Sequence, residues 1–338
     1  MTLVSVIVPC YNEQGTIQLL LDALYKQNYP RKNLEVIIAD GLSTDLTRSK
    51  IASFQKEHPD LLIKIIDNSK RIIPAALNIA LEAAQGKYIV RLDAHSMPYP
   101  GYITSCIQDL EEGIAENVGG VWEICPANSS WIARAIAISA SHPLGVGDAQ
   151  YRHADKSQFV DTVPFGAFQR SLVDHIGGYD ETLQTNEDYE FNVRVRQSGG
   201  RVWLNPAIRS VYFARPNLGA LARQYWRYGY WKGRMLIRYP RTIRWRQGLP
   251  PIFVLSLVGL ILLGIWLPIG LWIFGVEFII YTLVLLVTSS ILAIKRHDPT
   301  LFLGVPLAIF TMHLCWGTAL VWSLISSVII NQLSNFNR

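Results

Sequence analysis

Charged side chains are nearly absent from the last part of this 338-residue chain. From residue 247 to residue 294 the only charge is Glu277, and from 299 to 337 there is none. One membrane span needs roughly 20 apolar residues, so the first stretch has room for two spans and the second for one. These runs exclude an ordinary soluble protein and predict a membrane region.

Paired cysteines and a glycine-rich dinucleotide loop are also missing. The four cysteines show no CxxC and no spacing typical of a secreted disulfide scaffold, so we expect reduced thiols. No GxGxxG follows the first predicted strand, which disfavours a dinucleotide-binding dehydrogenase. The N-terminus from Met1 to Pro9 lacks a basic leader and a cleavage-site pattern, and it predicts a strand rather than a signal peptide. We therefore expect the N-terminal domain to stay in the cytosol.

Positive charge is concentrated in one segment, although the whole chain has a net charge of +5. Residues 215–249 contain no acid and nine basic residues: Arg215, Arg223, Arg227, Lys232, Arg234, Arg238, Arg241, Arg244 and Arg246. Because these nine exceed the net charge, the rest of the chain is acidic. That distribution argues against a nucleic-acid-binding protein. A basic segment beside an apolar one is typical of contact with membrane lipid headgroups or phosphates.

Short apolar strands alternate with helices over the first 95 residues. Strands are predicted at Leu3–Val8, Leu34–Ala39, Leu61–Ile66 and Tyr88–Leu92, and helices at about Gly15–Lys26, from Ser43 or Thr44 to about Lys56, and Pro74–Ala84. This alternation predicts an α/β, Rossmann-like, mainly parallel sheet with flanking helices. Later segments predict a helix at Trp131–Ser141 and strands at Arg201–Leu204 and Ser210–Phe213.

Polar side chains follow three of these strands where each strand ends. The loops begin near Pro9, Asp40 and Asp93, and His95 comes two residues after Asp93. Because the carboxyl ends of parallel strands meet at one edge of a sheet, we expect these loops to form a ligand site. The alternative for Asp93 and His95 is an ordinary turn after a strand.

Three helices have candidate N-caps. Ser43 or Thr44 is expected to cap the second helix, Ser129 or Ser130 the helix at 131–141, and Asn186 the helix that follows it. Glu187 and Asp188 lie in the first turn after Asn186. On spacing alone, they are acids that stabilise the positive end of the helix dipole.

The C-terminal third predicts an interfacial segment followed by three spans. The predicted divisions are residues 1–214, 215–249 and 250–330, with spans at about 251–268, 271–294 and 300–325. The segment at 218–238 is both aromatic and basic, which suits a helix at headgroup level. Basic residues before the first span and after the second predict a multi-pass protein of the inner (plasma) membrane with a cytoplasmic N-terminal domain.

Five segments, in order, resemble the motifs of a known family. They are Val6–Glu13, Ala39–Asp45, the segment from Asn78 to Asp93, Gly177–Asp188 and Gln224–Tyr228. Over about residues 3–228 the chain resembles family 2 inverting glycosyltransferases, which have the GT-A fold. The Asp-Ala-His form with three spans is most similar to membrane glycosyltransferases of succinoglycan-type exopolysaccharide synthesis.

Two residues depart from the family pattern. His95 stands where the family usually has a metal-binding Asp, although imidazole is also a ligand for such ions. Tyr228 stands in the place of a Trp. With only three predicted spans, this second departure argues against processive polymer synthesis.

The resemblance implies a role for each motif residue. Asp188 would be the catalytic base with Glu187 beside it. Gln224 and Arg227 would lie on the acceptor and diphosphate side, and Asp93 and His95 would hold a divalent cation, Mn²⁺ or Mg²⁺. The donor nucleotide would be bound by Pro9, Tyr11, Glu13, Asp40, Arg71 and Asp93, with Asp40 accepting from a uracil N–H. The alternative for Arg71 is a solvated loop arginine.

The function implied is sugar transfer with inversion. The donor would be a UDP-sugar, UDP-glucose or a similar hexose, and the acceptor a lipid-linked saccharide in exopolysaccharide or related glycan synthesis, where other glycan-assembly proteins are possible partners. A non-catalytic nucleotide-sugar-binding membrane module is the alternative, which the Asp-Ala-His departure supports and the Glu187-Asp188 pair opposes. A small transporter is disfavoured because three spans with one acid, Glu277, offer no evident pathway.

Overall fold

The computed structural model describes residues 2–336 and divides into two compact units. We call them the sheet unit, Met1–Glu123 with Gln150–Tyr212, and the helical unit, Ile124–Ala149 with Phe213–Arg338. The sequence-based division at residue 214 keeps 124–149 with the N-terminal domain. In the structure this segment packs with the C-terminal helices instead, because its helix α5 (Trp131–Ser141) lies against α12 (Leu301–Phe336).

A nine-stranded mixed sheet forms the centre of the sheet unit, in the order β3-β2-β1-β4-β8-β6-β9-β5, with β7 paired to β9. Its first four strands are parallel, and β4 then pairs antiparallel with β8. The strands are β1 (Val4–Cys10), β2 (Leu34–Asp40), β3 (Leu62–Asp67), β4 (Tyr88–Arg91), β5 (Met97–Pro98), β6 (Asn117–Cys125), β7 (Gln158–Phe159), β8 (Ala167–Gln169) and β9 (Val202–Phe213). The predicted α/β class is confirmed, with antiparallel strands completing the sheet.

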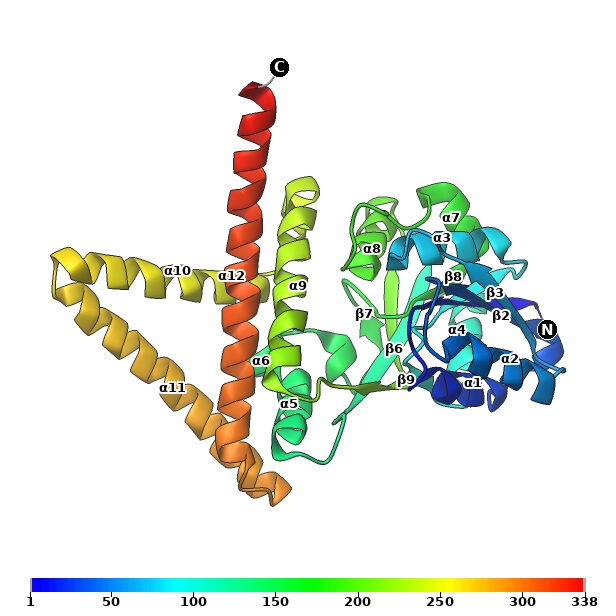
Figure 1. The fold of residues 1–338 in the computed structure, drawn as a ribbon, viewed down its shortest axis with the longest axis horizontal. Helices are drawn as coiled ribbons and strands as arrows, with labels where there is room; N and C mark the ends of the chain where they lie inside the picture. Colours follow the sequence, from blue (N-terminus) through cyan, green and yellow to red (C-terminus); the bar gives the residue numbers. More distant parts are fainter. Residues whose placement is uncertain (1, 337–338) are drawn as a thin grey trace. The chain divides into compact units, whose positions relative to one another are not determined.

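Helices cover both faces of this sheet because its strands alternate in the direction of their side chains (Figure 1). Val4, Val6 and Val8 enter one core with the first group of helices, whereas Ile7 enters the other core. The first group is α1 (Ile17–Tyr25), α2 (Thr47–Glu57) and α4 (Tyr102–Glu111). The second is α3 (Ile73–Ala83), α7 (Arg170–Ile176) and α8 (Glu187–Gln197). Burial on both faces explains why β1 and β2 are mostly apolar. The polar residues within them, Ser5 and Glu35, are buried and joined by a 2.6 Å hydrogen bond.

Strand β9 is one strand where the sequence predicted two. Pro206 interrupts the pattern because it lacks a backbone N–H. The next N–H, that of Ala207, donates locally to Asn205 Oδ1 at 2.9 Å, and the strand runs on to Phe213. On β6, Gly120 lies so close to β9 that a Cβ there would be 1.6 Å from the Ile208 carbonyl oxygen. Only glycine fits this approach.

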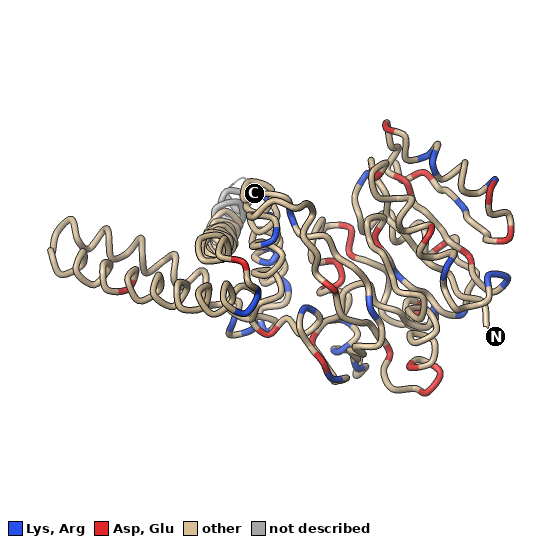
Figure 2. Tube along the Cα trace, turned by 90° about the horizontal axis from the view of Figure 1, so that it is seen from below, with Lys and Arg blue, Asp and Glu red and all other residues tan. Residues whose placement is uncertain are grey.

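The helical unit is built from long apolar helices. They are α9 (Leu218–Arg238), α10 (Trp245–Trp266), α11 (Ile269–Arg296) and α12, with the short α6 (Pro143–Val146) beside α5. Helices α9 and α12 lie side by side, and α10 and α11 form a hairpin (Figure 1). Figure 2 shows how few charged residues this hairpin carries. By length and composition, the segments Trp245–Trp266, Ile269–Arg296 and Leu301–Ser327 could each cross a membrane.

Polar contacts join these apolar helices to one another. Ser256 on α10 donates a 2.6 Å hydrogen bond to Glu277 on α11. The Tyr281 hydroxyl lies 3.0 Å from Nδ1 of His313 on α12. Glu277 therefore has a structural partner within the hairpin, as a polar group in a lipid environment requires.

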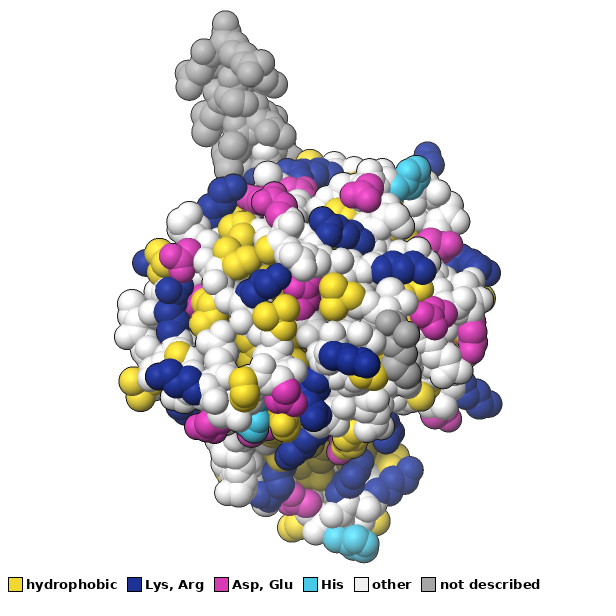
Figure 3. Space-filling view, turned by 90° about the vertical axis from the view of Figure 1, so that its right-hand side faces the viewer, with side chains coloured by type: hydrophobic (Ala, Val, Ile, Leu, Met, Phe, Trp, Pro, Cys, Tyr) yellow, Lys and Arg dark blue, Asp and Glu magenta, His cyan; other side chains and the backbone are white. Residues whose placement is uncertain are grey.

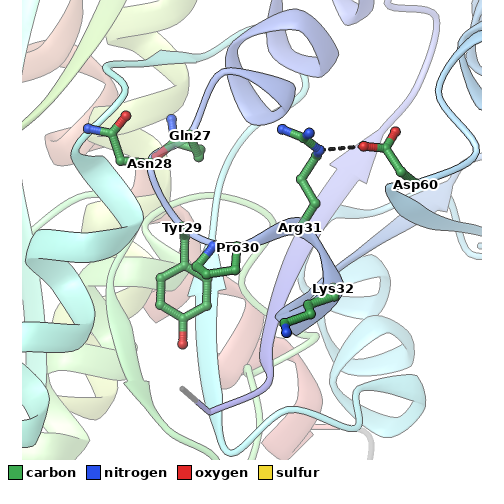
Figure 4. A pocket seen from close by; sticks show the side chains of 7 residues that line it. All are labelled: Gln27, Asn28, Tyr29, Pro30, Arg31, Lys32 and Asp60. Carbon is green, nitrogen blue, oxygen red and sulfur yellow. Dashed lines mark hydrogen bonds and ion pairs between the residues drawn. The ribbon is translucent and has the colours of Figure 1, made fainter.

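A surface pocket of about 480 Å³ lies at the amino end of β2 (Figure 4). Its lining residues are Gln27, Asn28, Tyr29, Pro30, Arg31, Lys32 and Asp60. Arg31 Nε and Asp60 Oδ2 form an ion pair of 2.5 Å across it. The pocket lies at the opposite end of the strand from Asp40.

On the face shown in Figure 3, basic and acidic side chains are interspersed rather than separated.

Candidate active site

The predicted donor-side residues gather at the carboxyl edge of β1, β2 and β4. Asp40, the last residue of β2, pairs in register with Cys10 at the end of β1. The loop with Tyr11 and Glu13 follows β1, and the loop with Asp93 and His95 follows β4. The parallel register therefore brings together residues that are far apart in the sequence.

Hydrogen bonds tie the loop after β1 to the loop after β2. The Asn12 backbone N–H donates to Ser43 Oγ at 2.8 Å, and Asn12 Oδ1 accepts from the Thr44 N–H at 2.9 Å. The prediction that Ser43 or Thr44 caps α2 is wrong: the N-cap position is Leu46. Ser43 instead donates to Asp40, three residues earlier at the end of β2.

Asp40 is fully buried and already accepts several hydrogen bonds. Its Oδ2 accepts from the Ser43 N–H at 2.9 Å and from Arg48 Nε at 2.5 Å, and its Oδ1 accepts from Ser43 Oγ at 2.5 Å. To hydrogen-bond to Asp40, the nucleobase of the donor must therefore replace one of these donors or approach the carboxylate past Ser43. Its role in nucleotide binding stays a prediction.

Tyr11 offers an exposed ring beside the Asp40 loop. The ring is 46% exposed and covers Gly41, where a Cβ would lie 3.1 Å from the tyrosine Cδ2. The Arg71 guanidinium is 6.0 Å from the ring centroid. A side chain at residue 41 would thus crowd the ring, and the exposed ring gives a nucleobase a surface on which to stack.

Left-handed backbone conformations of residues other than glycine recur in the loops at this edge. Asn12, Leu42, Arg71, Phe165 and Asn186 have φ between 51° and 69°. Each follows or precedes one of the elements that meet here. Such strained positions cluster at ligand sites, where the surrounding structure holds them.

Arg91 joins the donor-side loop to the predicted catalytic pair. Arg91 is the last residue of β4, and its side chain is 2% exposed. Its Nη2 lies 3.1 Å from Asp93 Oδ1 and 2.8 Å from Glu187 Oε1, and its Nη1 pairs with Asp188 Oδ1. Burial alone would lower the Arg91 pKa, but the Asp93 and Glu187 carboxylates raise it above its usual value. The sequence gives no sign of this role, since Glu187 on α8 is 96 residues away.

Helix α8 places Glu187 and Asp188 in its first turn, as predicted. Asn186 occupies the N-cap position, but the prediction that its side chain caps the helix is wrong. Its backbone is left-handed, with φ of 69°, instead of the extended conformation that a capping side chain needs. Glu187 is buried, whereas the Asp188 side chain is 23% exposed and accessible to a substrate.

The chemistry of the Asp93 and His95 side chains suits a divalent cation that is shared with a substrate. Across residues 2–336, no three His, Cys, Asp or Glu side chains are arranged to hold a metal ion. His95 Nδ1 lies 3.1 Å from Glu13 Oε1, beside the Asp93 loop. Mg²⁺ is usually bound by one or two carboxylates together with substrate phosphates, so a partial set of protein ligands fits that mode.

Gln224 and Arg227 lie on α9 of the helical unit. Gln224 is buried and donates a 2.8 Å hydrogen bond to the Tyr228 hydroxyl. Arg227 is exposed. Their part in binding the acceptor and diphosphate stays a prediction.

A family model described as glycosyl transferase family 2 matches residues 5–177, just over half of the chain. The chain belongs to this family. The resemblance found in the sequence motifs is therefore confirmed, and the protein is a glycosyltransferase.

Two curated proteins similar to this glycosyltransferase match it over most of their length. The succinoglycan biosynthesis protein ExoA of Rhizobium meliloti is 30% identical over 79% of this chain and 81% of its own. A Methanococcus voltae protein is 29% identical over 93% and 94% respectively. Its name is dolichyl N-acetyl-α-D-glucosaminyl phosphate 3-β-D-2,3-diacetamido-2,3-dideoxy-β-D-glucuronosyltransferase.

The fold of this glycosyltransferase is also found among solved structures. The mannosyltransferase PcManGT of Pyrobaculum calidifontis, solved with GDP-Man and Mn²⁺, superposes with a TM-score of 0.60. The match covers 96% of this chain and 87% of that one at 23% identity. It confirms the predicted GT-A-like fold.

Proposed function

We propose that this glycosyltransferase moves a hexose from a UDP-sugar, such as UDP-glucose, to a hydroxyl group of a lipid-linked saccharide. The transfer inverts the sugar carbon and serves exopolysaccharide or related glycan synthesis. The observation that carries the proposal is the group of carboxylates at the carboxyl edge of the sheet, Asp93 with Glu187 and Asp188, held around Arg91. The donor-side carboxylate, Asp93, and the proposed base, Asp188, thus both contact the guanidinium of Arg91.

Asp188 is the proposed base. Its side chain is partly exposed and lies at the start of α8, so a substrate hydroxyl can approach it. The carboxylate takes the proton of the acceptor hydroxyl as its oxygen attacks the sugar carbon from the side opposite the diphosphate. One in-line displacement with no covalent nucleophile gives inversion. Glu187 beside it is buried against Arg91 and holds the start of the helix.

The nucleotide is proposed to lie along the loops after β1, β2 and β3. Pro9 is buried in β1 and would support the loop that follows it. Tyr11 gives an aromatic surface, Glu13 and Asp40 give acceptors, and Arg71 gives a cation close to the Tyr11 ring. A divalent cation, Mn²⁺ or Mg²⁺, bound by Asp93 and His95 would stabilise the charge that develops on the leaving diphosphate. The carboxylate of Asp93 is 21% exposed and can face that charge.

The acceptor is proposed to be lipid-linked. Three apolar helices could cross a membrane, and the basic residues of 215–249 other than Lys232 and Arg246, whose side chains are buried, are suited to lipid phosphates, with Arg227 among them. The name of the Methanococcus voltae relative gives a dolichyl-linked sugar as its acceptor, and the Rhizobium relative belongs to succinoglycan biosynthesis. We place the protein in the inner membrane as a multi-pass protein with its sheet unit in the cytoplasm, beside other glycan-assembly proteins.

The test is nucleotide release by the purified protein in detergent. UDP-glucose, other UDP-sugars and GDP-mannose are each offered with a membrane lipid extract, with Mn²⁺, Mg²⁺ or neither. We expect metal-dependent UDP release that Asp188→Asn lowers by roughly 10²- to 10⁴-fold, while UDP binding stays intact. Release from GDP-mannose alone would contradict the UDP assignment. UDP binding without release from any donor would favour the non-catalytic binding module, and full turnover with a soluble acceptor would contradict the lipid requirement.

A further inference from the structure

Arg91 carries a deeply buried charge at the site, and the proposed mechanism assigns it no role. A guanidinium with 2% exposure is costly unless carboxylates surround it. Three do so, and their side chains are 21%, 9% and 23% exposed for Asp93, Glu187 and Asp188. The arginine therefore lies beneath the carboxylates, which face outward from it.

The planar guanidinium separates these carboxylates onto its two ends. Nη2 takes Asp93 and Glu187, whereas Nη1 takes Asp188. Phe165 supports the group, with its ring centroid 5.9 Å from the arginine Cζ. Arginine has a rigid fork with fixed spacing, which a lysine ammonium lacks because it is a single point of charge. The distance between the Asp93 and Asp188 carboxylates is thus set by one rigid group.

We infer that Arg91 is a positioning residue that fixes the spacing between the donor-side carboxylate, Asp93, and the base, Asp188. The inference deepens the proposed function and rests on it. In-line attack needs the base and the leaving group on opposite sides of the same carbon. A misplacement of about 1 Å can cost roughly 10²-fold in rate. Arg91 acts through Asp188 and touches no substrate.

A purely structural role for Arg91 makes different predictions. If Arg91 only holds α8 to β4, its loss lowers stability, donor binding and turnover together. Its loss of activity then multiplies with the loss caused by a change at Asp188. If it positions Asp188, its loss lowers kcat and leaves the binding of UDP unchanged. In that case the double variant loses less activity than the product of the Arg91 and Asp188 losses, because the two residues act as one unit.

The experiment uses the intact protein in detergent with the best UDP-sugar and lipid extract. The variants are Arg91→Lys, Asp188→Asn, their double variant, and Arg196→Met, an exposed arginine on α8, as the matched control. Thermal unfolding reports the fold, calorimetry reports the Kd for UDP, and UDP release reports kcat and the donor KM. Lysine keeps the charge but cannot bridge both sides, so Arg91→Lys tests spacing rather than charge.

We expect Arg91→Lys to bind UDP within about threefold of the wild type and to lose roughly 10²-fold in kcat with little change in donor KM. The double variant should turn over no more slowly than Asp188→Asn alone. The inference is overturned if Arg91→Lys keeps kcat within threefold, if it loses UDP binding or unfolds, or if the two losses multiply. If Asp188→Asn is itself fully active, the base assignment fails first, and the inference falls with it for a reason that the experiment identifies.

Discussion

Arg194 offers a direct test of how the start of α8 is held in place. Its guanidinium forms two hydrogen bonds of 2.7 and 2.8 Å to Glu190, one turn earlier on the helix. It also donates to the backbone carbonyls of Ile176, Gly177 and Gly178 at 2.7 to 3.1 Å. One side chain thus ties the glycine turn before Tyr179 to the helix that carries Asp188. We predict that Arg194→Met strongly destabilises the sheet unit.

The size of the effect follows from the burial of Glu190. Its side chain is 1% exposed, so the substitution leaves a buried carboxylate without its charged partner. Removing one partner of such a pair costs about 3–5 kcal/mol. A domain of the size of the sheet unit loses roughly 2–4 °C in Tm per kcal/mol, which gives a fall of roughly 6–20 °C. Exposed Arg196 on the same helix is the control, because its replacement by Met should cost less than about 0.5 kcal/mol.

The assay is thermal unfolding of the intact protein in detergent, followed by tryptophan fluorescence. Glu190→Gln combined with Arg194→Met should be more stable than Arg194→Met alone, because no charge is then left buried. A fall below about 2 °C for Arg194→Met, or an equal fall for Arg196→Met, would refute the reasoning.

Two further predictions concern the sheet unit. Gly120→Ala should cost about 3 kcal/mol of unfolding free energy in a denaturation assay, since its Cβ would lie 1.6 Å from the Ile208 carbonyl oxygen. Gly15 has open space around it, so Gly15→Ala should be neutral or stabilising in the same assay. Burial raises the pKa of Asp109 above 3.8, so this group lowers stability as pH rises through its folded pKa. Asp109→Asn should therefore raise Tm at pH 7, and the gain should vanish as pH falls towards 3.8; an equal gain at both pH values would refute this cause.

The features that the sequence predicted best depend on neighbours in the chain. Ser130 caps α5 by accepting from the Ala133 N–H at 3.2 Å, as the local pattern indicates. The cap prediction for α2 failed because the helix begins later, after Leu46, and Ser43 donates to Asp40 at the end of β2. The buried strands were predictable because most of their residues are apolar and many are β-branched. The gap predicted between Leu204 and Ser210 was wrong, because β9 runs without a break from Val202 to Phe213.

The candidate site likewise contains residues that the sequence predicted and one that only the fold reveals. Strand ends placed Asp40, Asp93 and His95 at one edge, since parallel order alone determines which ends meet. Arg91 could not be found this way. An arginine at the end of an apolar strand gives no sign of its partners until the fold brings α8 to β4. Charge clusters of this kind depend on three-dimensional contacts that no periodicity encodes.

The order of the strands also determines when the site can form during synthesis. Strands β3, β2, β1 and β4 all lie within the first 91 residues, so this parallel half can pair as soon as it leaves the ribosome. Its antiparallel neighbour β8 begins only at Ala167, after a segment, Ile124–Ala149, whose packing partners lie in the last helices. Until then β4 has an open edge and Arg91 lacks Glu187 and Asp188. The nascent chain therefore carries a half-sheet with an open edge and an arginine that has only one of its three carboxylates, Asp93, and a chaperone that covers this edge would protect it from pairing with other chains.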